Sequence, residues 1–197
     1  MKIAAIVALI IWVYVLTVIR RAKAGFWYYL VGSVGLFSFS MILLEPLLVP
    51  ILQKLVAAVT GFVGGLTGLF ESYFDSGLLF ISHNDINLSL FIDFECSGVI
   101  EILAFISLLA FFGIYERYER VIVGILGTLL IFFFNVMRIF IICITVYFGG
   151  MQIYFTAHTI IGRLFFYVCT VLLYFYVFTK PQVIRQSLGG FSHDSSQ

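Results

Sequence analysis

The chain has few charged residues. Only 11% of its 197 residues are Asp, Glu, Lys or Arg, 62% are hydrophobic, and the mean hydropathy is +1.14. Soluble domains carry about 25% charged residues, so this composition excludes an ordinary soluble domain. The net charge is +1, and the sequence has neither a long basic run nor an acidic tail. It therefore predicts a membrane protein surrounded by lipids, with no nucleic-acid partner.

Cysteines are also scarce. The three, Cys96, Cys143 and Cys169, show neither a CxxC pair nor metal-finger spacing, which argues against a disulfide scaffold and against a metal site. Phosphate and dinucleotide fingerprints are missing as well, because the glycine-rich stretch 61–68 has no strand before it and no Lys-Ser/Thr after it. No cofactor is expected.

Long apolar runs are what the sequence has instead. A spanning helix needs about 20 mostly apolar residues, and the runs that fit are 3–19, 26–44, 97–114, 121–148 and 159–178. The first run resembles a signal peptide, but arginines follow it directly. We therefore interpret it as a retained helix.

A further run, 47–70, is amphipathic rather than uniformly apolar. It either lies at the membrane interface or crosses as a span packed through small residues, since Ala57, Gly61 and Gly65 are four apart. We predict an all-α polytopic membrane protein with five or six transmembrane helices in one domain, 1–185. A possible interfacial helix and a disordered tail, 186–197, complete it.

The most polar stretch, 71–95, predicts a β-hairpin. Two short apolar segments, 78–82 and 87–92, flank His83, Asn84 and Asp85, a pattern typical of a hairpin over 78–92. Orientation follows from Lys and Arg, which favour the cytoplasmic side near span ends. With five spans, and 47–70 not crossing, these basic residues lie inside: Arg20, Arg21, Lys23, Arg117, Arg120, Lys180 and Arg185. The hairpin is then extracellular and the protein a multi-pass component of the plasma membrane.

Three polar side chains fall at one depth in this topology. Cys96 lies where the chain leaves the hairpin and starts a helix, a position where free N–H groups and the helix dipole favour the thiolate. Arg138 follows Val121 by 17 residues, about 26 Å along a helix that begins inside, with Asn135 one turn below it. His158 opens the last span from outside. The sequence therefore predicts a thiol, a guanidinium and an imidazole in one outer layer.

Each of these residues alone has a purely structural explanation. The cysteine could pack as a small apolar side chain, the arginine could extend its charged end to the membrane surface, and the histidine could simply lie at the interface. Together they fit acyl transfer from a peptide bond through a thioester. The thiolate attacks, the histidine protonates the leaving amine, and the arginine stabilises the thiolate or the oxyanion. Glu95 would raise the thiol pKa unless it points away or pairs with an arginine, and Glu101 should face the protein interior.

These residues resemble the exosortase/archaeosortase family. The segments that carry the resemblance are Glu95-Cys96-Ser97-Gly98-Val99 at a helix start, Asn135-Val136-Met137-Arg138-Ile139 in a later span, and His158 before the last span. The resemblance covers roughly Val56 to Lys180. The family motif more often has a small residue before the cysteine and isoleucine after the glycine, and many members have more spans. The chain thus resembles a short, divergent branch of Gram-positive type.

The resemblance implies a membrane cysteine peptidase or transpeptidase, unrelated in fold to soluble sortases and acting at the outer membrane face. Its expected partners are exported proteins whose C-terminal sorting signal combines a short motif, a transmembrane helix and a basic cluster. It implies Cys96 as nucleophile, Arg138 as stabiliser and His158 as acid/base. The expected supporting residues are Glu95, Ser97, Gly98 and Asn135.

Other interpretations stay open. A non-enzymatic transporter subunit or scaffold would use Arg138 as an anion or lipid-headgroup site and carry Cys96 incidentally. A thiol-redox or metal-handling protein would use Cys96 and His158, although the sequence lacks a CxxC pair and a second external ligand. The oligomeric state and the acceptor of the thioester do not follow from the sequence.

Overall fold

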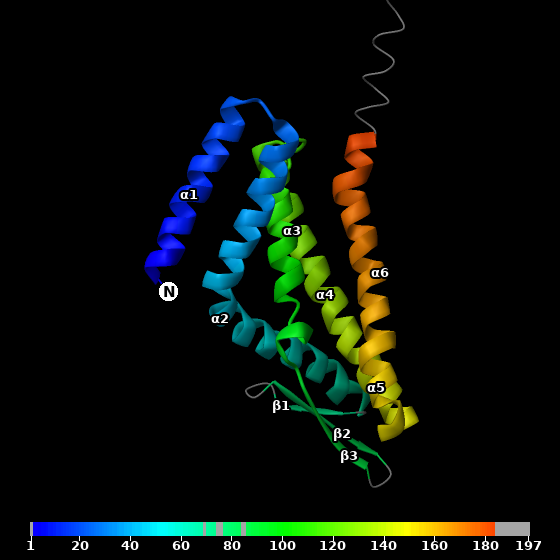
Figure 1. The fold of residues 1–197 in the computed structure, drawn as a ribbon. Coiled ribbons are helices and arrows are strands. Elements are labelled where there is room, and N and C mark those ends of the chain that lie inside the picture. The colour runs from blue at the N-terminus through cyan, green and yellow to red at the C-terminus, as the bar shows by residue number, and fades with distance from the viewer. Residues whose placement is uncertain (1, 69, 74–76, 84–85, 184–197) are drawn as a thin grey trace, which may run out of the picture.

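Helices make up most of the chain. The computed structural model describes residues 2–68, 70–73, 77–83 and 86–183 (Figure 1). Its α-helices are α1 (Lys2–Arg21), α2 (Gly25–Thr67), α3 (Val99–Phe111), α4 (Arg117–Gly149), α5 (Tyr154–Thr156) and α6 (Gly162–Tyr174). Two π-helical stretches, Ala157–Ile161 and Phe175–Thr179, flank α6, and two 3-10 turns are Phe94–Cys96 and Met151–Ile153. The strands are β1 (Glu71–Tyr73), β2 (Leu78–His83) and β3 (Ile86–Phe91).

Three helical segments in the described residues are long and apolar enough to cross a membrane: Gly25–Thr67, Arg117–Gly149 and Tyr154–Val183. Their outer faces are apolar, as on α4, where Ile125, Leu129 and Phe133 lie four residues apart and are each more than half exposed. Such a continuous apolar face needs lipid rather than water around it. The fold is that of a helical membrane protein with a small sheet.

Helix α3 is shorter than the span expected over 97–114. It has 13 residues, about 20 Å of helix against a hydrocarbon core about 30 Å thick. Gly98, with a φ of 78°, precedes its first residue, and the extended Phe112 follows its last. The 3-10 turn that contains Cys96, Phe94–Cys96, precedes the helix.

Helix α2 differs from the two separate helices that the sequence predicted. The sequence predicted a span over 26–44 and a separate helix over 47–70, divided at Glu45 and Pro46, but α2 runs unbroken for 43 residues with Pro46 and Pro50 inside it. A straight helix of that length would extend about 65 Å, twice the hydrocarbon thickness. Figure 1 shows α2 changing direction partway, so that its second part crosses the end of the bundle beside the sheet. Prolines bend a helix without ending it when the lost N–H bonds are tolerated.

The small residues in the second part of α2 contact the sheet. A Cβ at Gly61 would meet the Ser72 side chain, and a Cβ at Gly64 would meet the Phe70 ring. The Ser72 hydroxyl donates a 2.8 Å hydrogen bond to the Ala57 carbonyl. The glycines therefore let β1 approach the helix backbone. Gly65, part of the spacing that favoured a packed span, has open space beside it.

The sheet has the order β1-β2-β3, with antiparallel pairing throughout. Strands β2 and β3 form the hairpin expected over 78–92, whereas β1 was not expected. Residues 84 and 85 of the expected turn, and the expected disordered tail 186–197, lie outside the described residues. Leu79, Ile81 and Leu90 are buried in one apolar core with Cys96 and Ile139. The sheet thus packs directly on the segment that holds the predicted nucleophile.

The basic ends of the helices lie together. The turn between α1 and α2, the start of α4 and the far end of the last helix are at one end of the bundle, and the sheet and α5 are at the other (Figure 1). The first end carries Arg20, Arg21, Arg117, Arg120 and Lys180. This arrangement agrees with the preference of Lys and Arg for one membrane face.

Candidate active site

A short 3-10 turn presents Cys96. Asp93 caps it, and its carboxylate Oδ1 accepts a 3.0 Å hydrogen bond from the Cys96 N–H. The Ser97 hydroxyl donates to the Phe94 carbonyl at 2.7 Å. Gly98 then turns the chain into α3 with a left-handed φ of 78°, a backbone conformation that favours glycine. The turn fixes a fully buried thiol.

The structure brings together the three residues predicted for chemistry. The Cys96 Sγ lies 3.2 Å from the His158 Nε2, and the Arg138 Nη2 donates to the same Sγ at 3.6 Å. The three come from the 3-10 turn, from a π-helical stretch, Ala157–Ile161, and from α4. π-helical turns recur at functional sites because they redirect a side chain. The catalytic roles of the three residues remain predictions.

Helix α4 also holds the backbone beside the thiol. The Arg138 Nη1 donates to the Glu95 carbonyl at 3.4 Å, and the Asn135 Nδ2 donates to the Cys96 carbonyl at 2.7 Å. Both side chains are buried, Arg138 with 3% exposure, and the Arg138 guanidinium lies 5.7 Å from the centroid of the Phe166 ring. One turn of α4 therefore holds the backbone of the turn that contains Cys96 through two side-chain hydrogen bonds.

Burial raises the pKa of the Cys96 thiol to about 12, and the Asp93 carboxylate adds to this, while Arg138 and Arg163 oppose it. The expectation that a helix start would favour the thiolate is therefore wrong for this structure. Desolvation of a fully buried sulfur outweighs the nearby positive charges, and the 3-10 turn sets the thiol ahead of the first turn of α3. At neutral pH Cys96 is a thiol whose hydrogen can be donated to the His158 Nε2.

We expect alkylation to show this directly. In a Cys143→Ala/Cys169→Ala chain in detergent, the rate of Cys96 alkylation by iodoacetamide should rise about tenfold per pH unit from pH 8 to 10, because only the thiolate reacts. An ordinary thiol levels off above about 8.5. Mass spectrometry of quenched samples gives the rates, and the denatured chain provides the ordinary profile. A plateau in the folded chain below pH 9 would contradict the raised pKa.

The side chain of Glu95 pairs with an arginine, one of the two alternatives that the sequence left open. Its Oε2 lies 2.8 Å from the Arg163 Nη2. Sequence reasoning had not singled out Arg163, Asp93 or Tyr154 as site residues. The Tyr154 ring stacks on the His158 imidazole, with centroids 5.9 Å apart and planes 23° apart. The Asp-x-x-Cys capping pattern was the available signal for Asp93.

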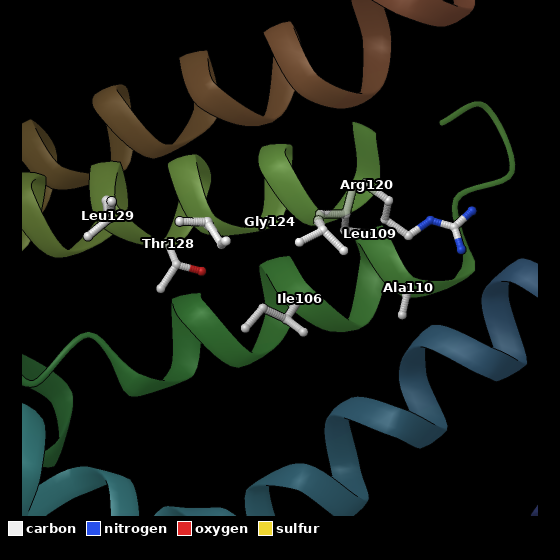
Figure 2. A pocket seen from close by; sticks show the side chains of 9 residues that line it. Ile106, Leu109, Ala110, Arg120, Gly124, Thr128 and Leu129 are labelled. Atoms are coloured by element: carbon white, nitrogen blue, oxygen red, sulfur yellow. The ribbon is translucent and has the colours of Figure 1, made fainter. Parts of the chain in front are cut away.

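Grooves also lie away from these residues. Figure 2 shows one between α3 and α4, lined by Ile106, Gly124, Leu129 and their neighbours, with Arg120 at one end. None of Cys96, Arg138 and His158 lines it. The groove is lined mainly by apolar side chains of the two helices. This groove therefore does not mark the residues that meet around the sulfur.

Comparison with known proteins gives one finding. The family model described as "Transmembrane exosortase" matches residues 1–175, so the match reaches further toward the N-terminus than the resemblance expected over 56–180. No curated protein and no solved structure matches the chain.

Proposed function

The chain belongs to the transmembrane exosortase family, and from this premise we propose that it is a membrane-embedded cysteine peptidase or transpeptidase. The observation that carries the proposal is the approach of the His158 Nε2 and the Arg138 Nη2 to one sulfur, at 3.2 and 3.6 Å. A nucleophile within hydrogen-bond reach of a base is the arrangement that covalent catalysis requires.

The proposed reaction begins with proton transfer from the Cys96 thiol to the His158 Nε2. The thiolate attacks the carbonyl carbon of the scissile peptide and forms a tetrahedral oxyanion. Collapse of this intermediate breaks the C–N bond, and His158 returns the proton to the leaving amine, which leaves a thioester on Cys96. Water or an amine then attacks the thioester, and the thiol is regenerated.

Arg138 is proposed to stabilise negative charge in this sequence of steps. Its guanidinium stays protonated even in a site of low dielectric, and it already donates to the sulfur that would carry the charge. In a buried site a preorganised donor stabilises a developing anion more than water would. Asn135 supports the geometry from one turn away, because it holds the Cys96 carbonyl.

The proposed substrates are exported proteins with a C-terminal signal made of a short motif, a transmembrane helix and a basic cluster. The family resemblance supports this class. The scaffold interpretation, with Arg138 as a lipid-headgroup site, has less support, since both Nη atoms of this buried arginine bond to the protein itself. That interpretation expects Cys96→Ala to be silent and Arg138→Ala to be harmful.

Loss of the C-terminal tail tests the proposed function. Candidate proteins with such a signal and an epitope after the basic cluster are co-expressed with the wild-type chain or with its Cys96→Ala variant. Separation of the epitope from the rest of the protein only with the wild type supports peptidase or transpeptidase activity. Equal loss with both chains would contradict it.

We further propose that the sheet and the site face the outside of the plasma membrane. In a chain whose three cysteines are alanine, Ser89→Cys, at an exposed position of β3, should react with an impermeant maleimide on intact cells. Tyr118→Cys, 78% exposed at the start of α4, should react only after permeabilisation, because the basic end faces the cytoplasm. Gel-shift labelling measures both. The reverse pattern would show that the orientation is wrong.

A further inference from the structure

An ion pair joins the two segments that present the nucleophile and the base. The Glu95 Oε2 and the Arg163 Nη2 lie 2.8 Å apart. Glu95 is in the 3-10 turn next to Cys96, and Arg163 is in the first turn of α6, which continues the π-helical stretch of His158. The Arg163 side chain is 36% exposed and that of Glu95 is 61% exposed. The pair therefore lies at the surface beside a buried site.

We propose that Glu95 and Arg163 are positioning residues, whose ion pair sets the separation of the Cys96 Sγ and the His158 Nε2 and keeps the Glu95 charge off the sulfur. This rests on the proposed function, which assigns the chemistry to Cys96 and His158. Among the described residues, the hydrogen bonds to the sulfur come from His158 and Arg138 and not from this pair. The effect of the pair on the reaction would therefore act through Cys96 and His158.

Two separate contacts hold Glu95. The Arg138 Nη1 donates to its carbonyl at 3.4 Å, and Arg163 binds its carboxylate. The first contact ties the nucleophile turn to α4 and the second ties it to the helix of the base. Of these two contacts, only the one between Arg163 and the Glu95 carboxylate joins the segment of Cys96 to that of His158. Cys96 and His158 are 62 residues apart along the chain. Misplacement of a reacting group by about 1 Å can cost about a hundredfold in rate.

The exposure of the pair argues against a mainly stabilising role. Surface ion pairs contribute little to folding, because water screens them and holding the side chains costs entropy. A pair with only that role would leave turnover almost unchanged when removed. Its position, one residue from the nucleophile and five residues from the base, instead predicts an effect on the reaction.

The charges around Cys96 make the two partners distinguishable. Arg138, Arg163 and Asp93 act on the thiol, and Glu95 is directed toward Arg163. Removing Arg163 would leave the Glu95 carboxylate unpaired near the sulfur and disfavour the thiolate. Removing the Glu95 charge would leave Arg163 unpaired and favour the thiolate. Loss of either partner should misplace Cys96 and His158 to the same extent. Removal of Arg163 and removal of the Glu95 charge should, however, change the reactivity of the Cys96 thiol in opposite directions.

The test uses the full chain with Cys143→Ala and Cys169→Ala, and compares Glu95→Gln, Arg163→Gln and the charge swap Glu95→Arg/Arg163→Glu. We expect each single variant to slow release of the substrate tail about tenfold or more. At pH 8, alkylation of Cys96 by iodoacetamide should become about two- to fivefold faster in Glu95→Gln and slower by a similar factor in Arg163→Gln. The swap should return both rates to within about threefold of the parent chain.

Other results would overturn the proposal. Single variants that release the tail within about twofold of the parent rate would exclude a positioning role, as would a correctly folded swap that does not recover. If both single variants changed the alkylation rate in the same direction, this would exclude the proposal that the ion pair keeps the Glu95 charge off the sulfur. Size-exclusion elution and thermal unfolding in detergent identify a misfolded variant. Arg163→Met, which also removes the charge but keeps a long unbranched side chain, then replaces Arg163→Gln. If the two single variants changed alkylation in opposite directions but the parent chain released no tail, the effect of the ion pair on the thiol would be supported. The peptidase assignment would be contradicted.

Discussion

Replacement of Cys96 by alanine is expected to lower the rate of tail release from a co-expressed substrate by at least about a thousandfold, since no thioester can form without the nucleophile. The fold should survive, because alanine fills most of the same buried space and the backbone contacts of the turn come from Asp93 and Asn135. Immunoblots of the epitope-tagged tail over a time course give the rates. Crosslinked or trapped acyl-enzyme should also disappear.

Cys143→Ala provides the matched control. Cys143 is fully buried in the same apolar core as Cys96, but it lies on α4 and has no described contact with His158 or Arg138. Its replacement should leave tail release within about threefold of the wild type, since removing one buried sulfur costs only local packing. A Cys96→Ala chain as active as this control would rule out the thioester route. If Arg138→Ala were harmful in the same assay, the scaffold interpretation would be preferred.

Arg138→Lys is expected to reduce tail release by about a hundredfold or more, although the positive charge is kept. The guanidinium donates through Nη1 to the Glu95 carbonyl and through Nη2 to the Cys96 sulfur. A lysine ammonium is a single, strongly hydrated point charge and cannot reproduce this fork. Loss of one preorganised donor of this kind costs about a hundred- to a thousandfold in rate.

Arg117→Lys is the control for Arg138→Lys. It makes the same chemical change at an exposed position at the other end of α4, so its rate should match that of the wild type. Elution in detergent shows whether each variant is folded. Activity of Arg138→Lys within about threefold of the wild type would show that charge alone suffices and that the fork geometry is not needed.

The helical membrane fold followed from composition and from the lengths of the apolar runs. The hairpin over 78–92 followed from two short apolar segments that flank turn residues. The unbroken α2 did not follow, because prolines at 46 and 50 mark either the end of a helix or a bend in one. Only packing on β1 and the rest of the bundle distinguishes these outcomes. The additional strand β1 was missed for a similar reason, since a three-residue strand carries almost no periodicity of its own.

The thiol shows where local reasoning failed. Its position near a helix start implied a thiolate, but the sheet and α4 bury the sulfur completely, and desolvation raises its pKa. The pairing of Glu95 with Arg163 likewise depends on α6 passing beside the 3-10 turn. Residues 68 positions apart meet only when helix packing brings them together.

By itself, the sequence determined that this is a membrane protein and which polar side chains lie within or beside its apolar segments. Placing an arginine or an asparagine in lipid is costly, so such residues are conspicuous within apolar runs. Tertiary structure alone decided which of those side chains meet at one sulfur, how far that sulfur is removed from solvent, and which charge pairs with Glu95. Distance and burial arise from the packing of segments far apart in the chain, and no local pattern records them.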